Sequence, residues 1–221
     1  MFEPFKITAY PQCGIISDAY LPIDAVLYYQ VHRDQLGAQD VTLPGARNVD
    51  GGRHHPLPLQ KVNTYKRRDS RLWFYAASFA QWSEPYIEGT DHWNKRMDVS
   101  LIDLVDWQGR KPRLEVSSGR YKSYHMPVFY RHALSVSWHV VGDGGEIERL
   151  LRHVTHLGKK YAQGWGSILR WDIESWPEDW SVWGPERKLM RAIPSEEPGA
   201  PVYGLKPSYW FASNQVPCRL P

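Results

Sequence analysis

"DGGEIERLLRHVTHLGKKYAQGWGSILRW", residues 143–171, is the stretch that decides the fold. Asp143, with Glu146 three residues later, forms a capping-box pattern. The apolar residues that follow recur at helical spacing: Ile147, Leu150, Leu151, Val154 and Leu157. Gly158 then stands where a left-handed glycine is expected at the end of a helix. The stretch predicts an amphipathic helix over residues 143–157, a loop with three glycines, and the start of a strand.

Strands are expected on both sides of this helix. Before it, the apolar residues Leu134, Val136, Trp138 and Val140 alternate with the polar residues Ser135, Ser137 and His139. After the loop, Leu169, Trp171 and Ile173 alternate with charged residues. Alternation of this kind predicts half-buried strands. Residues 132–174 are therefore predicted to form a strand–helix–strand unit.

The N-terminal part of the chain predicts a second unit of the same kind. Residues 5–16 are a strand candidate interrupted by Pro11, and residues 71–82 are another. Between them, residues 22–36 are a helix candidate with Pro22 and Asp24 near its first turn. Its apolar face would consist of Ile23, Val26, Leu27 and Val31. Two βαβ units in one chain predict an α+β fold with the split βαβ arrangement of ferredoxin-like and RRM-like domains.

Two segments depart from this pattern. Residues 81–131 interrupt the central hairpin, and a charged stretch of that length is too long for an ordinary loop. Beyond Trp176 the chain is rich in Pro, Glu and Trp and loses its periodicity. We therefore expect a domain over residues 1–175 with an insertion over 81–131. Residues 176–221 are expected to form an irregular extension that packs on the core or on a partner.

Charge and aromatic residues indicate the class of ligand. The net charge is only +3, but residues 53–71 and 110–131 each hold six Lys or Arg and one acid. The chain also has 11 Trp and 13 Tyr, many of them beside basic residues. Single-stranded nucleic acid needs aromatic rings for its bases and cations for its phosphates. The alternatives that stay open are solvated charge runs and aromatic residues that only pack.

The glycine-rich loop is not a nucleotide-binding motif. A P-loop follows a strand and precedes a helix, whereas here the predicted order is helix, loop, strand. Gly158, Gly164 and Gly166 would instead let the backbone approach a bulky ligand closely. Lys159 and Lys160 would supply positive charge, which suits a ribose–phosphate backbone. The plainer alternative is a helix cap followed by a tight entry into a strand.

Compartment and redox state follow from composition. Cys13 and Cys218 are too few for a disulfide framework, which fits a reducing cytoplasm, although one bridge between them stays open. The N-terminus "MFEPFKITAY" has no apolar core of a signal peptide. No apolar run approaches the length of a membrane span. We expect a cytoplasmic protein without membrane contact.

A split βαβ domain whose last helix runs into "LGKKYAQGWGSI" resembles the RAMP superfamily of CRISPR proteins. The "PIDAVLYY" helix and the long insertion make the chain similar to the type IV effector-complex subunit that binds the 5′ handle of the guide RNA (crRNA). That subunit is the counterpart of the fifth Cas protein of type I complexes. The resemblance covers residues 1–175 and implies a non-catalytic role. The resemblance also implies contacts with the large subunit and the backbone subunit, and leaves target DNA near the PAM open as a further partner. Separately, we expect neither a cofactor nor a metal.

The resemblance and the basic blocks together give the candidate RNA-binding residues. Those of the loop are Gly158, Lys159, Lys160, Gln163, Gly164, Trp165 and Gly166. Those of the first basic block are Lys66, Arg67, Arg68 and Arg71. Those of the insertion, which would correspond to the thumb of the family, are Lys95, Arg96, Arg110, Lys111, Arg113, Arg120, Tyr121, Lys122, Tyr124 and His125.

Two other functions stay open. A metal-independent endoribonuclease would need a histidine as its general acid and base. The candidates are His125 and His32, and His32 stands near Tyr28, Tyr29 and Arg33. His54 and His55 are expected to lie in a loop. His153 and His156 could share a metal ion, but the spacing places no third ligand beside them. The third possibility is a protein–protein adaptor whose aromatic residues anchor its interfaces.

Overall fold

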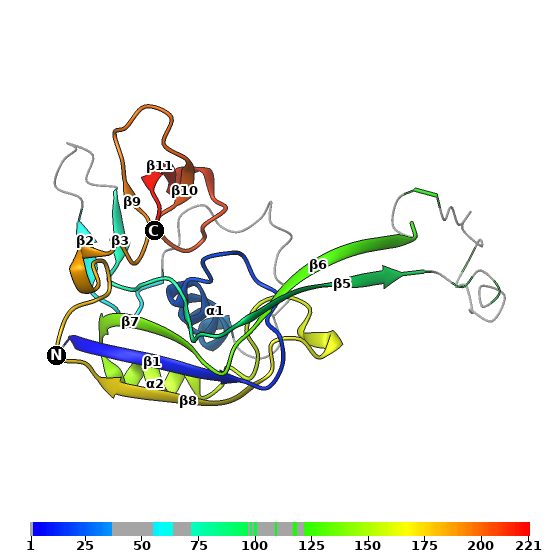
Figure 1. The fold of residues 1–221 in the computed structure, drawn as a ribbon, viewed down its shortest axis with the longest axis horizontal. Helices are drawn as coiled ribbons and strands as arrows, with labels where there is room; N and C mark the ends of the chain where they lie inside the picture. The colour runs from blue at the N-terminus through cyan, green and yellow to red at the C-terminus, as the bar shows by residue number, and fades with distance from the viewer. Residues whose placement is uncertain are drawn as a thin grey trace.

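Four strands form the main sheet, in the spatial order β4–β7–β1–β8, with every neighbouring pair antiparallel (Figure 1). They are β1 (Glu3–Pro11), β4 (Gln81–Trp82), β7 (Val136–Gly142) and β8 (Ile168–Ser175). The structure is a computed structural model, and it describes residues 2–36, 55–63, 72–96, 98, 100, 109, 117–118 and 122–221. Two helices, α1 (Ile23–Leu36) and α2 (Gly144–Leu151), complete an α+β fold.

Both helices pack on the same face of the sheet. Alternate residues of β1 and β7 point toward them, and Ile7, Val136 and Trp138 are fully buried there. Ile23 of α1 and Ile147 of α2 belong to the same apolar cluster. The alternation predicted for these strands therefore marks the core face of the sheet. The helix predicted over residues 22–36 begins one residue later, at Ile23.

Helix α2 begins as predicted but is shorter. The Asp143 side chain accepts a hydrogen bond from the Glu146 amide at 3.1 Å. The helix ends at Leu151, and the prediction that it extends to Leu157 is wrong. Because the Leu157 amide donates to the Gly166 carbonyl at 2.8 Å, the chain here pairs with the following strand instead of continuing the helix. Gly158 is consequently not the residue that caps this helix.

Two residues of the predicted strands face solvent instead of the core. Leu169 is 64% exposed, because the register of β8 against β1 shifts between Tyr10 and Pro11 and turns this side chain outward. Leu134 is 78% exposed because it lies in the turn before β7, outside the alternation of the strand.

His139 departs from the prediction in the opposite direction. It was expected on a polar face, but it is 6% exposed and packs against the rings of Trp176 and Trp180, with centroids 5.2 and 5.0 Å away. Neither of its ring nitrogens has a hydrogen-bond partner among the described residues. Burial, together with the positive charge of Lys6, lowers the pKa of His139 from 6.5 to about 4.

Acid is therefore expected to destabilise the protein through His139. The folded state excludes a proton that the unfolded state binds below pH 6.5, so this histidine costs stability as the pH falls from 6.5 to about 4. The loss should reach roughly 3 kcal/mol. In urea unfolding across this pH range, the free energy of unfolding should fall less steeply with decreasing pH for His139→Phe than for the wild type. An exposed histidine, His153, provides the control, because His153→Gln should leave the decline unchanged.

Residues 176–221 are more regular than expected. They contain a three-stranded sheet of β9 (Ile193–Pro194), β10 (Val202–Gly204) and β11 (Gln215–Arg219), in the order β10–β11–β9, and the short 3₁₀ turns η4 (Pro185–Arg187) and η5 (Ala212–Asn214). Their buried residues Ala192, Leu205 and Cys218 form a second apolar cluster with Phe74 and Phe79. The prediction of an irregular extension is wrong in this respect.

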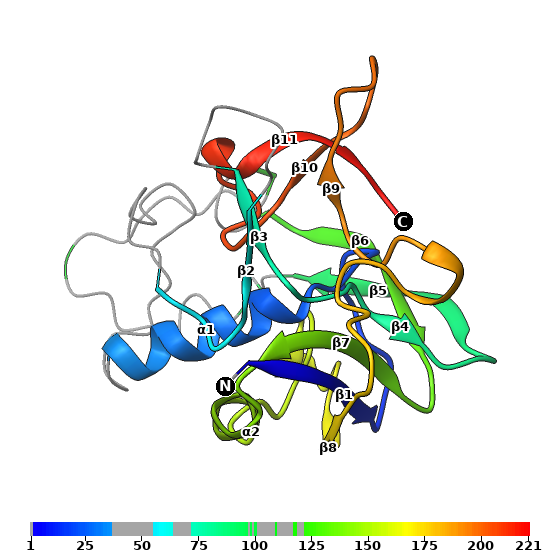
Figure 2. The same ribbon diagram turned by 90° about the vertical axis from the view of Figure 1, so that its left-hand side faces the viewer.

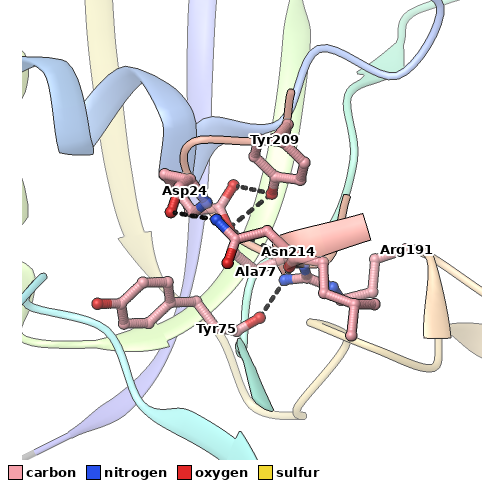
Figure 3. A network of polar contacts seen from close by, with 8 residues as sticks. Asp24, Tyr75, Ala77, Arg191, Tyr209 and Asn214 are labelled. Atoms are coloured by element: carbon pink, nitrogen blue, oxygen red, sulfur yellow. Dashed lines mark hydrogen bonds and ion pairs between the residues drawn. The ribbon is translucent and has the colours of Figure 1, made fainter. Parts of the chain in front are cut away.

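A buried polar network joins this extension to α1 (Figure 3). The Tyr209 hydroxyl donates to both carboxylate oxygens of Asp24, at 2.6 and 2.8 Å. The Arg191 guanidinium lies 3.9 Å from the same carboxylate and donates to the Tyr75, Ala77 and Leu205 carbonyls. Burial raises the pKa of Asp24, while the charge of Arg191 and the Tyr209 hydroxyl oppose that rise. The extension is thus held by charge as well as by apolar packing.

Two hairpins leave the body in different directions. Strands β5 (Ile87–Lys95) and β6 (Tyr124–His132) form a long antiparallel ribbon that projects from the body, here called the arm (Figure 1). Strands β2 (Lys61–Asn63) and β3 (Trp73–Tyr75) form a short hairpin on the side away from the arm. The insertion predicted over residues 81–131 contains the arm, but Gln81 and Trp82 belong to the main sheet.

Both cysteines are free: Cys218 is buried and Cys13 is half-buried. Cys13 donates from its thiol to the Gly164 carbonyl at 3.1 Å, so it belongs to the surroundings of the glycine-rich loop. None of the helices in the described part of the chain is both long and apolar enough to span a membrane.

Candidate nucleic-acid interface

One side of the arm carries cations and aromatic rings together. The cross-strand register places Trp93, Lys95 and Tyr124 on the same side of the ribbon, which we call the inner face. The Trp93 and Tyr124 rings stack with centroids 6.1 Å apart. The Lys95 and Lys122 ammonium groups lie 6.0 and 5.9 Å from the centre of the Tyr124 ring. The inner face therefore presents stacked rings bordered by positive charge.

The glycine-rich loop packs against the inner face near the body. The Trp165 ring lies 4.9 Å from the Tyr130 ring, and the Lys160 ammonium lies 3.4 Å from the centre of the Trp93 ring. Gly89 makes room for this packing, because a Cβ atom there would overlap the Tyr130 ring. Trp93, Lys95, Lys122, Tyr124 and Lys160 thus form one continuous surface, which we call the loop–arm surface. The fold brings its members together from three separate parts of the sequence.

The base of the arm is fixed to the body. Ile15 and Arg131 exchange two backbone hydrogen bonds, of 2.7 and 3.0 Å. The Arg131 side chain also pairs with Glu88 at 2.6 Å and donates to the Ala19 carbonyl at 3.2 Å. These contacts hold the arm in a defined position relative to the loop.

The three glycines of the loop have different roles. A Cβ atom at Gly158 would overlap the Ile16 carbonyl oxygen, and one at Gly166 would overlap the Leu157 carbonyl oxygen. Both also have positive φ values, of +80° and +73°. Gly164 has a φ of +88° but nothing within 4 Å of its Cβ position. Packing within the protein thus explains Gly158 and Gly166, and only Gly164 leaves open space for a ligand.

The loop offers fewer free amides than the sequence suggests. The Lys159 and Gly166 amides donate to the Ile16 and Gly14 carbonyls, at 2.7 and 2.9 Å. The Gln163 and Gly164 amides donate within the loop, around the 3₁₀ turn η3 (Tyr161–Gln163). These four amides already have partners within the protein, and the Lys160, Lys95 and Lys122 ammonium groups supply positive charge to the surface.

The lysines of the loop differ in the same way. The Lys159 ammonium is paired with the Asp18 carboxylate at 2.8 Å, whereas Lys160 is directed onto Trp93. Lys160 also adopts a left-handed backbone conformation, with a φ of 64°, which turns its side chain toward the arm. Of the two predicted lysines, only Lys160 belongs to the loop–arm surface.

His125 lies on the opposite side of the arm. It is level with Asn94 in the register, its Nδ1 atom is 2.5 Å from the Asn94 Oδ1 atom, and its ring stacks on His92 with centroids 4.5 Å apart. The structure therefore separates His125 from Tyr124 and Lys122, with which it was grouped in the sequence.

The remaining predicted residues divide into two groups. Arg96 and Gln163 are exposed, Arg96 directly after β5 and Gln163 at the end of η3. The others lie outside the described residues: Lys66, Arg67, Arg68, Arg71, Arg110, Lys111, Arg113, Arg120 and Tyr121. Trp93 was not predicted as a site residue. The signal that could have found it is its alternation with Lys95, which places both side chains on one face of a strand.

Two of the histidines considered in the sequence, His32 and His55, lie in contact with each other. His32 Nδ1 lies 3.2 Å from His55 Nε2, and the Tyr28 ring is 6.4 and 5.8 Å from the two imidazole rings. His153 and His156 lie beyond the end of α2, so they do not share a helix face. In the part of the chain that the structure describes, no group of three or more His, Cys, Asp or Glu side chains could hold a metal ion.

Comparison with protein families decides the identity of the chain. The family model of the CRISPR type IV associated protein Csf3 matches residues 3–221. The chain belongs to the Csf3 family. The match extends over the body, the arm and the C-terminal extension, so all three are parts of a Csf3-type protein. A comparison with curated proteins gave no match.

Proposed function

We propose that this Csf3-family protein is a non-catalytic, RNA-binding subunit of a type IV CRISPR ribonucleoprotein, and that it holds the 5′ handle of the guide RNA. The observation that carries the proposal is the loop–arm surface, where Lys160 lies over Trp93 beside the stacked ring of Tyr124. Membership of the type IV family supports the assignment to such a complex. The large subunit, the backbone subunit and target DNA near the PAM are the further partners of this proposal.

The chemistry of the surface suits a single strand. Bases that are not paired expose their flat faces, and stacking on an aromatic ring contributes about 1–3 kcal/mol per base. Trp93 and Tyr124 offer such rings, and Lys95, Lys122 and Lys160 lie close enough to neutralise the phosphates between successive bases. A phosphate that attracts Lys160 would also uncover the Trp93 ring for a base.

The topology supports placing the protein among the ferredoxin-like RAMP proteins. The chain order β1–α1–β4–β7–α2–β8 gives an antiparallel sheet in the order β4–β7–β1–β8, with both helices on one face. This is the order expected for a split βαβ domain. In that correspondence the arm takes the place of the thumb of the family.

RNA binding should depend on the loop–arm surface. A repeat-derived RNA incubated with the protein in EDTA is expected to give a stable mobility shift without cleavage. The double variant Lys122→Gln with Lys160→Asn should bind roughly tenfold or more weakly, and its plot of log affinity against log salt should be shallower by about 1.4. Asparagine is chosen at position 160 because it tolerates the left-handed conformation.

The matched control removes two exposed charges from elsewhere. Arg152→Gln with Arg219→Gln changes the net charge equally, but neither residue lies on the loop–arm surface. It should leave the affinity within about twofold of the wild type, since distant charges are screened. Equal losses in both double variants would show that only net charge matters and would refute the proposed surface. A wild-type protein that binds no RNA would favour the adaptor.

The His32–His55 pair favours one other function, a metal-independent endoribonuclease. Two imidazoles in contact could divide the roles of general base and general acid in RNA cleavage. The same incubation in EDTA distinguishes the two functions, because cleavage that is lost in His32→Ala would establish the nuclease. Under the leading proposal the RNA remains intact, and His32→Ala binds it as the wild type does.

A further inference from the structure

Strand β8 forms a long free edge of the main sheet. It is the last strand in the order β4–β7–β1–β8, and among the described residues no strand pairs with its outer side. The opposite edge, β4, has two residues, whereas β8 has eight. β8 lies along the lower border of the sheet in Figure 1 and at the bottom of the molecule in Figure 2. A strand edge of this length is a template for the addition of another strand.

The backbone groups of Trp171 and Ile173 point toward this free edge. The Trp176 amide donates to the Pro4 carbonyl at 2.9 Å, which sets the phase of the alternating hydrogen bonds between β8 and β1. In the register of the two strands, every second residue of β8, including Asp172, therefore bonds β1. The residues between them, Trp171 and Ile173, present their amides and carbonyls on the other side of the strand.

A hollow beside the edge has room for an added strand. It measures about 660 Å³ and lies between β8 and the end of α2, with Leu151, Val154 and Trp171 in its lining. Trp171 and Ile173 are only half-buried in the single chain, on the face that packs against the apolar core. A strand added at β8 would bring alternate side chains over these residues and bury them further.

The charges on β8 favour a second copy of this chain as the added strand. Arg170 and Asp172 lie on the other face of the strand, with side chains 53% and 35% exposed. If two β8 strands pair antiparallel about a two-fold axis at Trp171, Arg170 of each copy stands opposite Asp172 of the other. A centre at Arg170, Asp172 or Ile173 would instead place like charges opposite each other, which is destabilising. The edge is therefore complementary to itself in one register.

The ion pair within one chain is compatible with this pairing between copies. Arg170 donates to Asp172 of its own chain at 3.3 and 3.2 Å, and its guanidinium lies 3.7 Å from the centre of the Tyr10 ring. A guanidinium has five N–H donors, so it can bond a second carboxylate. Each Asp172 carboxylate likewise has lone pairs for two guanidinium groups.

We propose that β8 is a dimerisation edge, at which two copies of this chain join their main sheets into one continuous antiparallel sheet centred on Trp171. A two-fold axis perpendicular to the sheet keeps the helices of both copies on the same face. The interface uses none of the residues of the loop–arm surface. The proposal goes beyond RNA binding and does not rest on it, and its test contains no RNA.

The first measurement is the mass of the wild-type protein, freed of nucleic acid, by sedimentation equilibrium over about 1–100 μM. We expect the mass to rise toward twice the 25.7 kDa of one chain. Hydrogen exchange of the same samples locates the interface. Residues 168–175 should exchange more slowly at the high concentration, while β4 should be unchanged. A protein that stays a single chain at the highest concentration would overturn the proposal and leave the edge to a strand of another protein.

Charge reversal tests the register. Arg170→Glu alone and Asp172→Lys alone each make both pairs between copies repulsive, and each should weaken dimerisation roughly tenfold or more. In an equimolar mixture of the two variants both pairs become attractive again, so a dimer with one copy of each should form with an affinity near that of the wild type. Arg219→Glu is the control, because it reverses an exposed charge on β11 and should change dimerisation by less than about twofold.

Two further results would refute the proposed edge. One is a mixture no more dimeric than its components, when circular dichroism shows both variants to be folded. The other is protection from exchange that grows with concentration at a surface other than β8, since self-association would then belong to that surface. If either variant fails to fold, the exchange measurement on the wild type decides between these outcomes.

Discussion

Arg191→Met is expected to lower the free energy of unfolding by about 3–5 kcal/mol. Arg191 is fully buried, and its guanidinium donates to three carbonyls while it faces the Asp24 carboxylate (Figure 3). Methionine fills a similar volume but leaves those carbonyls without a donor and the buried carboxylate without its counter-charge. The loss should appear as a lower midpoint of urea unfolding, followed by circular dichroism.

Two comparisons show whether burial of charge causes this loss. Arg152 is 70% exposed, and among the described residues it pairs with Glu148 alone, at 3.3 Å, so Arg152→Met should cost less than about 1 kcal/mol. In an Asp24→Asn background, Arg191→Met should cost less by about 1–3 kcal/mol, because the uncompensated charge is gone. An Arg191→Met protein as stable as Arg152→Met would contradict the role assigned to the network.

The Asp24–Arg191 network also shows where the sequence is uninformative. Asp24 stands in the first turn of a helix, where an acid is ordinarily solvated, and no periodicity distinguishes it from an exposed residue. Its partner lies in the extension, so nothing local reports their contact. Charged residues that are buried in pairs are fixed by tertiary packing, and sequence patterns do not predict them.

Apolar patterns predicted burial better than they predicted secondary structure. Val154 and Leu157 continue the apolar spacing of α2, and both are buried, yet they lie beyond the end of the helix. The spacing reports only which side chains face the core. The backbone between them is not helical because the Leu157 amide donates to the Gly166 carbonyl and the Thr155 carbonyl accepts from the Ile168 amide, and no helical pattern contains these long-range bonds.

The candidate interface was predictable in composition but not in geometry. Lys160 could be predicted from the glycine-rich loop, and Tyr124 and Lys122 from the basic stretch around them. Their meeting with Trp93 depends on the register of the arm and on the packing of Trp165 against Tyr130. Both are long-range features. The sequence therefore indicates the kind of ligand, while the structure indicates which cations and rings can act on it together.

Gly166→Ala is expected to destabilise the protein by about 3–4 kcal/mol. The added methyl group would overlap the Leu157 carbonyl oxygen, and the φ of +73° disfavours any side chain there. The overlap cannot be relieved locally, because the Gly166 amide donates to the Gly14 carbonyl at 2.9 Å and its carbonyl accepts from the Leu157 amide at 2.8 Å. Urea unfolding would measure the loss.

Gly164→Ala is the matched control, because it shares the positive φ but meets nothing within 4 Å. It should cost only the strain of a left-handed alanine, about 1–2 kcal/mol. RNA binding at low temperature, where both variants remain folded, adds a second measurement. Side chains, and not the loop backbone, are proposed to bind the RNA. The RNA affinity of Gly164→Ala should therefore stay near that of the wild type. A Gly164→Ala protein that is stable but loses RNA would instead show that the loop backbone itself contacts the ligand. Equal stability losses in the two variants would contradict the packing role of Gly166.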